Sequence, residues 1–286
     1  MNKLNKIKVV FAILMFISGL GIALYPYISN LIATKHASQA IQNYNETVKQ
    51  ANKEKLDAAK EAARKYNEQL SSAEVRDANG ENEEEGTSYI DMLGLGEALG
   101  YITIPDIDVE LPIYEGTNDD ALHEGVGHLT QSSYPIGGES THSVLTGHRG
   151  LPDAVLFTDL DKVEIGDIFY LHIMDEILAY QVDQIKVVEP EVTEDLEIVK
   201  GQDYCTLVTC TPYAINSHRL LVRGIRTEYT EEESKVQYQS LQTGTVVKRV
   251  VDAWLWIVVT IGVVVGSEAL LLIALIRRRK RRKMED

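Results

Sequence analysis

The chain has 286 residues, of which 43 are acidic and 28 are lysine or arginine, so its formal net charge is −15 at pH 7. This length accommodates one or two domains with a sizeable core. The acidic balance argues against nucleic acid or an anionic surface as a partner.

The first apolar segment lies at the N-terminus. Residues 1–32 contain three lysines and no acidic residue, and an apolar run extends from residue 9 to about residue 32. We predict a membrane anchor over residues 1–32. A cleaved signal peptide is the alternative, because "ASQA" ends in a small-x-small pattern at Ala40. The retained anchor is favoured, since the apolar run weakens at residues 25–26, far from Ala40.

The second apolar segment is residues 253–276, which seven consecutive basic residues, 277–283, follow directly. At about 1.5 Å per residue, a helix of this length spans a hydrocarbon core of roughly 30 Å. Because basic flanks stay in the cytoplasm, we predict a multi-pass membrane protein whose two termini, including the tail 277–286, are cytoplasmic. The region between the two segments, with 18 basic and 40 acidic residues, is then extracellular.

Residues 33–98 are predicted to form a helical segment followed by an acidic loop. Apolar residues recur at three- and four-residue steps over residues 35–70, as in an amphipathic helix. We favour packing of this helix on the following domain over a coiled-coil stalk, since its apolar stripe is mostly alanine and tyrosine. Residues 71–88 are acidic and polar and are typical of a loop.

The central region, residues 99–226, is rich in short β-type runs such as "YITIP", "HSVLTGH", "CTLVTC" and "RLLVRGIR". Turn signals separate them, and about eight strands fit in the region. The predicted fold is therefore mainly β, with a closed β-barrel that follows N-terminal helices and is flanked by two transmembrane helices. Residues 227–252 are predicted to be a polar linker.

The two cysteines, Cys205 and Cys210, lie in one predicted strand. Five residues of extended chain separate them by roughly 16 Å, and bridged Cα atoms lie within about 7 Å, so we expect no disulfide between them. Cys205 lies mid-strand and is expected to be buried and inert. Cys210 lies at the strand end, where a side chain can leave the core, and is the candidate reactive thiol.

The next predicted strand begins at Arg219, and eight residues connect it to Cys210. Antiparallel pairing would place Arg219 nearly opposite Cys210, with Arg223 on the same face about 13 Å further along. A guanidinium beside a thiol favours the thiolate and can stabilise an oxyanion. A surface arginine in a hairpin is the alternative interpretation.

A cysteine nucleophile also needs a group that moves protons. Of the seven histidines, His148 is the candidate, because it ends the strand "HSVLTGH" and precedes a turn. His142 begins the same strand and lies about 20 Å away, and His218 alternates to the face opposite Arg219. The sequence contains no metal-binding or phosphate-loop motif, so we expect no metal and no cofactor.

These segments, "TLVTCTPYAINSHRLLVRG" and "GGESTHSVLTGHRGLPDAVLFTDLDKV", resemble the sortases of Gram-positive bacteria, most closely the class C, pilus-assembling group. The resemblance runs from about residue 100 to residue 226. It implies an eight-stranded sortase barrel with Cys210 as nucleophile, His148 as acid and base, and Arg219 as the residue that steadies the substrate carbonyl or oxyanion. It also implies pilin or surface proteins with LPXTG-like sorting signals as donors.

The amine that resolves the thioacyl enzyme would be a pilin lysine in class C and a cell-wall precursor in housekeeping sortases. A non-catalytic pilus assembly factor is a further alternative, which the presence of Cys210, His148 and Arg219 disfavours. One departure concerns the class C lid, an Asp-Pro-aromatic triplet that this sequence lacks. Asp77, followed by Ala78 and Asn79, is the nearest candidate, in a segment with little apolar surface to hold it over the site.

Overall fold

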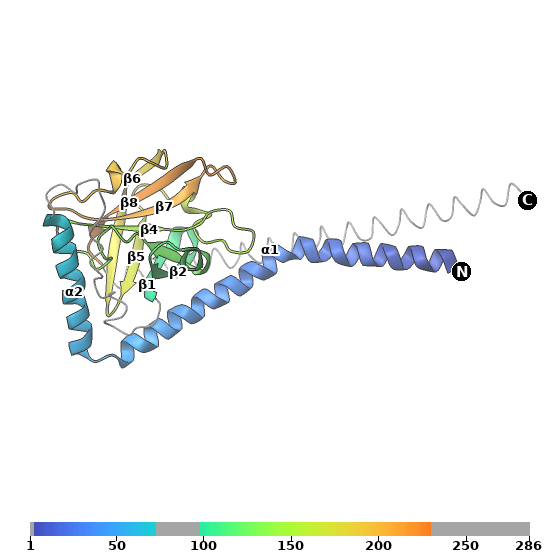
Figure 1. The fold of residues 1–286 in the computed structure, drawn as a ribbon, viewed down its shortest axis with the longest axis horizontal. Helices are drawn as coiled ribbons and strands as arrows, with labels where there is room; N and C mark the ends of the chain where they lie inside the picture. The colour runs from blue at the N-terminus through green and yellow to red at the C-terminus, as the bar shows by residue number, and fades with distance from the viewer. Residues whose placement is uncertain (1–2, 73–97, 230–286) are drawn as a thin grey trace, which may run out of the picture. The chain divides into compact units, whose positions relative to one another are not determined.

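The computed structural model describes residues 3–72 and 98–229, in which two long helices precede a closed β-barrel (Figure 1). The predicted second apolar segment 253–276 and the basic tail 277–286 lie outside the described residues, as does the linker beyond residue 229. The predicted loop 71–88 lies outside them from residue 73 onward.

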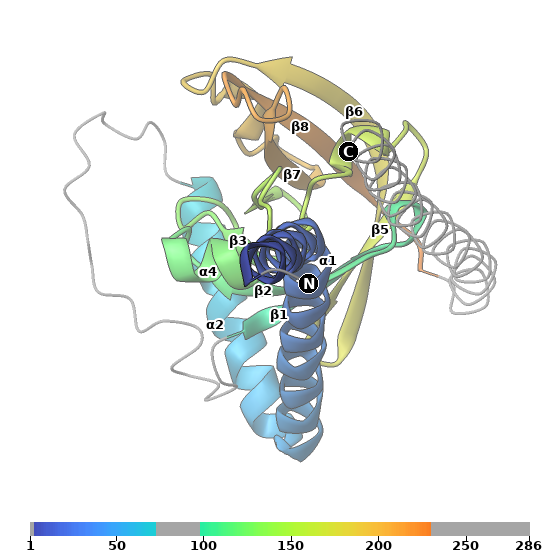
Figure 2. The ribbon, with the colours of Figure 1, turned by 90° about the vertical axis from the view of Figure 1, so that its right-hand side faces the viewer.

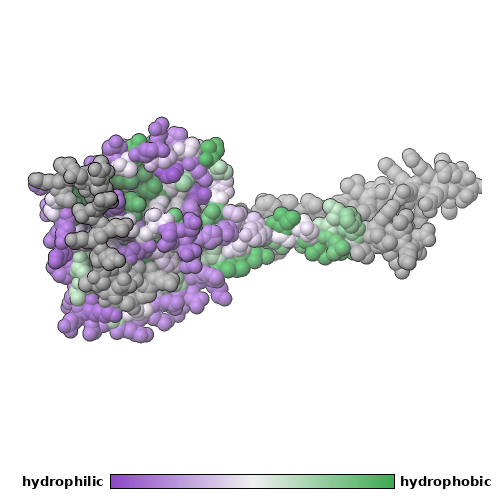
Figure 3. Space-filling view, in the orientation of Figure 1, coloured by the Kyte–Doolittle hydropathy of each residue, from purple (hydrophilic) through white to green (hydrophobic). Residues whose placement is uncertain are grey.

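Helix α1 (Lys3–Gln50) joins the predicted anchor and the start of the predicted amphipathic helix in one continuous element. Among the described residues, Ile13–Gln50 is the one helical stretch long and apolar enough to cross a membrane, with a mean hydropathy of 1.4 over its most apolar window. Its large apolar side chains between residues 11 and 32 are exposed and form an apolar stretch along the helix (Figure 3). This composition suits a membrane anchor or a signal segment.

The helical segment predicted over residues 35–70 is divided between two helices. Helix α1 ends at Gln50, and α2 (Lys53–Ser72) begins after a bend at Ala51. Asn52 starts the second helix, since its Oδ1 accepts a hydrogen bond from Lys55 N at 2.9 Å and so satisfies an N–H group that has no partner inside the helix. The apolar spacing continues across the bend, which is why periodicity alone did not indicate it.

Both helices pack on the barrel, as predicted. The buried side chains that join the core of the barrel are Tyr44 and Val48 from α1 and Leu56, Ala59 and Ala63 from α2. The Tyr44 hydroxyl donates to Leu99 O at 3.0 Å and accepts from Met174 N at 2.6 Å. Tyr44 thus ties α1 to β1 and to the turn between β5 and β6.

The barrel confirms the predicted count of eight strands. They are β1 (Ala98–Ile104), β2 (Val109–Glu115), β3 (Val126–His128), β4 (Thr141–Thr146), β5 (Ile168–Ile173), β6 (Glu176–Val188), β7 (Asp203–Thr211) and β8 (His218–Thr227). Around the barrel they follow the order β1-β2-β3-β4-β7-β8-β6-β5, and β5 closes on β1. The pairs β2–β3 and β4–β7 are parallel, and the other pairs are antiparallel.

Short elements fill the connections between strands. A helix, α4 (Asp119–Glu124), precedes β3, and three single 3-10 turns are η1 (Pro105–Ile107), η2 (Leu160–Lys162) and η3 (Glu194–Leu196). The turn η2 lies in the long connection between β4 and β5, which also contains His148.

Alternation along β7 decides which side chains face the barrel interior. Cys205 and Leu207 belong to the main core, whereas Val208 belongs to a second, small apolar cluster with Val144 and Leu221. Successive side chains of a strand point to opposite faces, so Val208 and Cys210 face outward. Helix α1 contacts β1 and β2, on the side of the barrel opposite β7 and β8 (Figure 2).

Candidate active site

Strands β7 and β8 bring Cys210 and Arg219 together. The strands are antiparallel, and Cys210 and Arg219 are directly opposite partners in the register. The predicted pairing is therefore confirmed. Directly opposite residues extend their side chains on the same face of a sheet, so the Arg219 side chain lies on the face that carries the Cys210 thiol.

His148 reaches the same level from the other side of β7. Strands β4 and β7 run parallel, with Thr146 paired to Val208. The pairing continues past the end of β4, because Gly147 N donates to Val208 O at 3.0 Å and Thr209 Oγ1 donates to Gly147 O at 2.7 Å. The next step of this register puts His148 beside Cys210, two residues beyond the last residue of β4 rather than at the strand end itself.

The three candidate residues thus lie side by side along the register, with Cys210 on β7 between His148, which follows β4, and Arg219 on β8. Adjacent strands lie about 4.8 Å apart, so this register brings the backbone of both flanking residues next to β7. Cys210, His148 and Arg219 are each partly buried. They lie on the outer face of the barrel, next to the small apolar cluster of Val144, Val208 and Leu221.

The guanidinium of Arg219 is held by backbone carbonyls. Its Nη1 donates to Asn216 O at 3.3 Å and to His218 O at 3.2 Å. Within residues 3–72 and 98–229, no carboxylate forms an ion pair with Arg219. Its positive charge is therefore available to a thiolate or an oxyanion beside Cys210.

Arg223, the other arginine on this face of β8, has a different environment. It lies opposite Thr206, and its guanidinium makes two bonds to the Asp183 carboxylate, of 3.0 and 2.7 Å. The same guanidinium lies 4.2 Å from the centre of the Tyr204 ring. These contacts indicate a structural role for Arg223.

The second cysteine is buried, as predicted, and both cysteines are free. Cys205 is fully enclosed in the core, and burial raises the pKa of its thiol well above the usual value. A thiol in this environment stays protonated and unreactive.

Several other histidines are held in structural hydrogen bonds. Nδ1 of His142 lies 2.8 Å from Glu197 O and Nε2 lies 2.7 Å from Thr206 Oγ1, and burial lowers the pKa of this histidine. Burial also lowers the pKa of His128, in the strand β3 that the sequence analysis did not single out, and lowers that of His172 to about 4. His218 is paired with Thr211, one position away from Arg219, and so points to the other face.

The turn that carries His148 contains contacts that the sequence analysis missed. His148 O accepts from Phe157 N at 3.1 Å, and a side chain at position 147 would meet the Phe157 ring at 2.8 Å, which explains the glycine there. The Arg149 guanidinium bonds to Thr211 Oγ1 and to Asp161 Oδ2. The "HRG" motif was the available signal, but only His148 was taken from it as functional.

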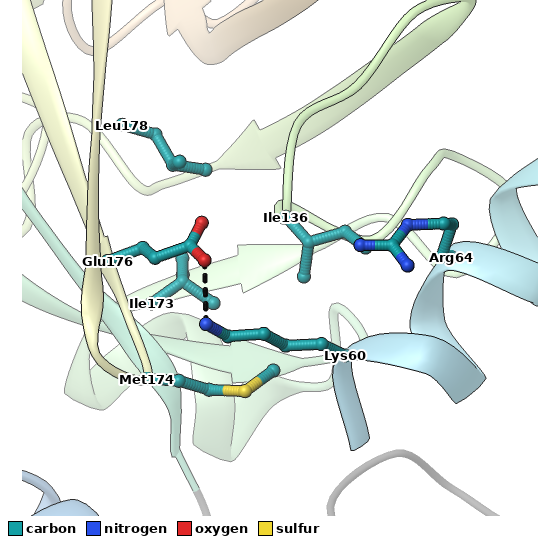
Figure 4. A pocket seen from close by; sticks show the side chains of 7 residues that line it. All are labelled: Lys60, Arg64, Ile136, Ile173, Met174, Glu176 and Leu178. Atoms are coloured by element: carbon teal, nitrogen blue, oxygen red, sulfur yellow. Dashed lines mark hydrogen bonds and ion pairs between the residues drawn. The ribbon is translucent and has the colours of Figure 1, made fainter. Parts of the chain in front are cut away.

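A small pocket lies at the other end of the barrel, between α2 and the β5–β6 hairpin (Figure 4). It has a volume of about 40 Å³ and is lined in part by Lys60, Met174 and Glu176. Glu176 begins β6, whereas Val188 at the far end of that strand pairs with Arg219. The Lys60 ammonium bonds to Asp175 and Glu176, so this pocket belongs to the contact that fixes α2.

The lid candidate Asp77 lies outside the described residues. Within the described ranges, no group of three or more histidine, cysteine and carboxylate side chains could hold a metal ion. The chemistry that the arrangement supports is nucleophilic acyl transfer, with a thiol between an imidazole and a guanidinium.

Comparison with known proteins identifies the family to which the chain is similar. Residues 102–227 match the sortase domain family. The chain is 34% identical over 119 residues to sortase D of Bacillus subtilis, a match that covers 42% of this chain and 57% of that protein. It thus spans little more than half the length of this curated relative.

Two solved structures match over almost their whole length. Sortase C of Streptococcus pneumoniae is 50% identical with a TM-score of 0.60, covering 67% of this chain and 98% of that one. Sortase C1 of Streptococcus agalactiae is 45% identical with a TM-score of 0.63, covering 70% of this chain and all of that one. The chain belongs to the sortase family, whose members are cysteine transpeptidases.

Proposed function

We propose that the protein is a membrane-anchored transpeptidase that cleaves LPXTG-like sorting signals with Cys210 as the nucleophile. It then joins the acyl group held on Cys210 to a lysine amine of a pilin subunit. The observation that carries this proposal is the shared level of Cys210 on β7, Arg219 on β8 and His148 two residues beyond β4. A thiol, a proton-transfer group and an oxyanion partner are the three parts that a cysteine acyl transfer requires.

In the first half-reaction, the Cys210 thiolate attacks the carbonyl carbon between threonine and glycine of the sorting signal. The carbonyl oxygen becomes an oxyanion, and the Arg219 guanidinium stabilises that negative charge. His148 donates a proton to the departing glycine amine as the C–N bond breaks. A thioester between the threonine carbonyl and Cys210 remains.

In the second half-reaction, a lysine amine attacks the thioester carbonyl. His148 takes the proton that the amine loses, the C–S bond breaks, and the Cys210 thiolate is regenerated. The product is an isopeptide bond between two subunits.

The likeness to class C enzymes favours a pilin lysine as acceptor. Sortase C of Streptococcus pneumoniae, described for its pilin substrate specificity, is 50% identical to this chain. A housekeeping sortase that attaches surface proteins to a cell-wall precursor is the second candidate, since sortases A are also among the relatives. Arg219 opposite Cys210 counts against a non-catalytic assembly factor.

A place at the cell membrane, with the barrel outside the cell, is part of the proposal. The exposed apolar side chains of α1 and the second apolar segment of the sequence support two membrane spans with both termini in the cytoplasm. Single cysteines introduced at residues 227–252 should react with an impermeant thiol reagent added to intact cells. Cysteines introduced beyond residue 277 should not react, and labelling there would contradict this topology.

The central experiment mixes the full chain in detergent micelles with an LPXTG peptide and a lysine-containing pilin fragment. We expect a thioacyl adduct on Cys210, seen by mass spectrometry, and then an isopeptide-linked product. Replacing the pilin fragment by a cell-wall precursor amine separates the two acceptor classes. Absence of an adduct on Cys210 with every sorting-signal peptide tested would refute the proposal.

A further inference from the structure

The Arg149 side chain is nearly buried, although arginine is usually exposed. Only 7% of its side chain is accessible. Its Nη1 donates to Thr211 Oγ1 at 3.2 Å, and its Nη2 donates to Asp161 Oδ2 at 2.5 Å. A planar guanidinium that bonds two separate partners in this way is fixed in both position and orientation.

The two partners connect segments that are far apart in the sequence. Arg149 directly follows His148, and Thr211 directly follows Cys210. Asp161 lies in η2, which belongs to the same β4–β5 connection as His148. The Arg149 guanidinium is therefore a side-chain bridge between the two segments that carry the proposed proton-transfer group and nucleophile.

The backbone hydrogen bonds of His148 and Gly150 hold the turn on one side. Phe157 N donates to His148 O at 3.1 Å, and Gly150 N donates to Thr158 Oγ1 at 3.2 Å. Both contacts tie the turn to its own connection and not to β7. Beyond the last ladder bonds at Gly147, the contact from Arg149 to Thr211 links the turn to the end of β7.

We propose that Arg149 is a positioning residue, which sets the placement of the His148 imidazole relative to the Cys210 thiol. The inference rests on the proposed roles of His148 and Cys210 and deepens them. Proton transfer and nucleophilic attack depend strongly on the relative placement of the reacting groups. A bridge that joins the residues next to both groups is suited to that task.

The charge of the bridge also matters. Arg149 brings a second positive charge near Cys210, in addition to Arg219, and Asp161 neutralises it. His148 is a further titratable group of this cluster, and His218 lies on the opposite face of β8. Removing the negative charge of Asp161 should leave the Arg149 charge uncompensated and favour the thiolate form of Cys210.

The first test compares Arg149→Lys and Thr211→Val with the wild-type chain in peptide cleavage. Lysine keeps the charge but cannot bond both partners in a fixed plane. For Arg149→Lys we expect kcat to fall about 10- to 100-fold with KM unchanged. Thr211→Val, which removes one of the two acceptors of the Arg149 guanidinium, should also lower kcat, but by a smaller factor.

The second test measures the pH dependence of Cys210 alkylation by iodoacetamide in Asp161→Asn. The midpoint should move to lower pH by about half a unit or more. Asp159→Asn is the matched control: it removes the same charge from the same segment, but its partner Lys162 is 61% exposed and the pair is solvated. The control should leave the midpoint near that of the wild type.

Wild-type kcat in Arg149→Lys, or equal midpoints in Asp161→Asn and Asp159→Asn, would overturn the inference. If Arg149→Lys does not fold, Thr211→Val decides the kinetic part, and wild-type kcat in that variant counts against the bridge. If the wild-type chain cleaves no sorting-signal peptide, the proposed function fails. The alkylation experiment, which needs no substrate, still decides whether the bridge controls the Cys210 thiol.

Discussion

Cys210 on β7 and Arg219 on β8 are directly opposite partners in an antiparallel pair, and both face the outside of the barrel. The six residues 212–217 connect the two strands and supply Asn216 O, one of the carbonyls that hold the Arg219 guanidinium. The hairpin thus positions the cation and the thiol by backbone geometry, and within residues 3–72 and 98–229 no carboxylate forms an ion pair with Arg219.

Arg219→Ala should reduce activity far more than Arg223→Ala does. Loss of one oxyanion partner typically lowers kcat by about 10²–10³. Arg223 is bonded to Asp183, and these side chains are 19% and 27% exposed. Its removal should therefore lower the free energy of unfolding, by about 1–2 kcal/mol, and leave kcat close to that of the wild type.

Peptide cleavage assays and thermal unfolding of both variants check this prediction. Arg219→Lys is a useful third variant, because it keeps the charge and loses the planar donor set. A kcat loss in Arg223→Ala as large as that in Arg219→Ala would mean that the roles have been assigned to the wrong arginine.

Cys210→Ala should abolish cleavage, whereas Cys205→Ala should retain most of it. Cys210 is at the outer surface at the level of His148 and Arg219, but Cys205 is completely buried and its thiol has a raised pKa. Cys205→Ala should instead lower the melting temperature, since it leaves a small void in the core. Mass spectrometry of the acyl adduct checks the pair, and an adduct on Cys210→Ala protein would contradict the assignment.

Much of the site could be predicted from the sequence because it depends on local pattern. The alternation within "CTLVTC" separated the buried Cys205 from Cys210, and the short connection to Arg219 set the register of the hairpin. The identity of His148 came from its place at a strand end. These are short-range relationships, which strand geometry determines.

The parallel pairing of β4 with β7 could not be predicted in the same way. More than fifty residues separate the two strands, and nothing in their composition specifies that they are neighbours or in which register they pair. The bond from Arg149 to Thr211 depends on that pairing and was missed with it. The strand β3 was missed because its three residues are too few for a periodicity signal.

The stability of the barrel should fall between pH 6.5 and pH 4. Burial lowers the pKa of His172 from 6.5 to about 4, so in that window the unfolded chain binds a proton that the folded chain does not. Stability is then fully present above the unfolded pKa and is lost as the pH falls, by up to about 1.4 kcal/mol per pH unit for this histidine. His128 and His142, whose pKa values are also lowered by burial, should add to the slope.

His172→Phe tests the contribution of this one group. The His172 ring stacks on Tyr101 with centres 4.1 Å apart, and phenylalanine can keep that contact. Melting temperatures measured at pH 7 and pH 5 should differ less in His172→Phe than in the wild type. Tyr101→Phe, which leaves His172 in place, should keep the wild-type difference, and an unchanged difference in His172→Phe would refute the attribution.

Tyr44→Phe should destabilise the contact between α1 and the barrel without affecting catalysis. The hydroxyl is buried and bonds both Leu99 O and Met174 N, so its removal leaves a buried carbonyl and a buried N–H group without their partner. Such a loss costs about 1–3 kcal/mol of the free energy of unfolding. The kcat should stay near the wild-type value, because α1 contacts β1 and β2, opposite the strands that carry Cys210 and Arg219.

Tyr66→Phe is the matched control. Its hydroxyl donates to Thr130 O in an exposed position where water can replace it, so the loss in the free energy of unfolding should stay below about 1 kcal/mol. Thermal unfolding and peptide cleavage of the two variants check both statements, and an equal loss of stability in the two would show that the Tyr44 bonds are not what holds α1 on the barrel.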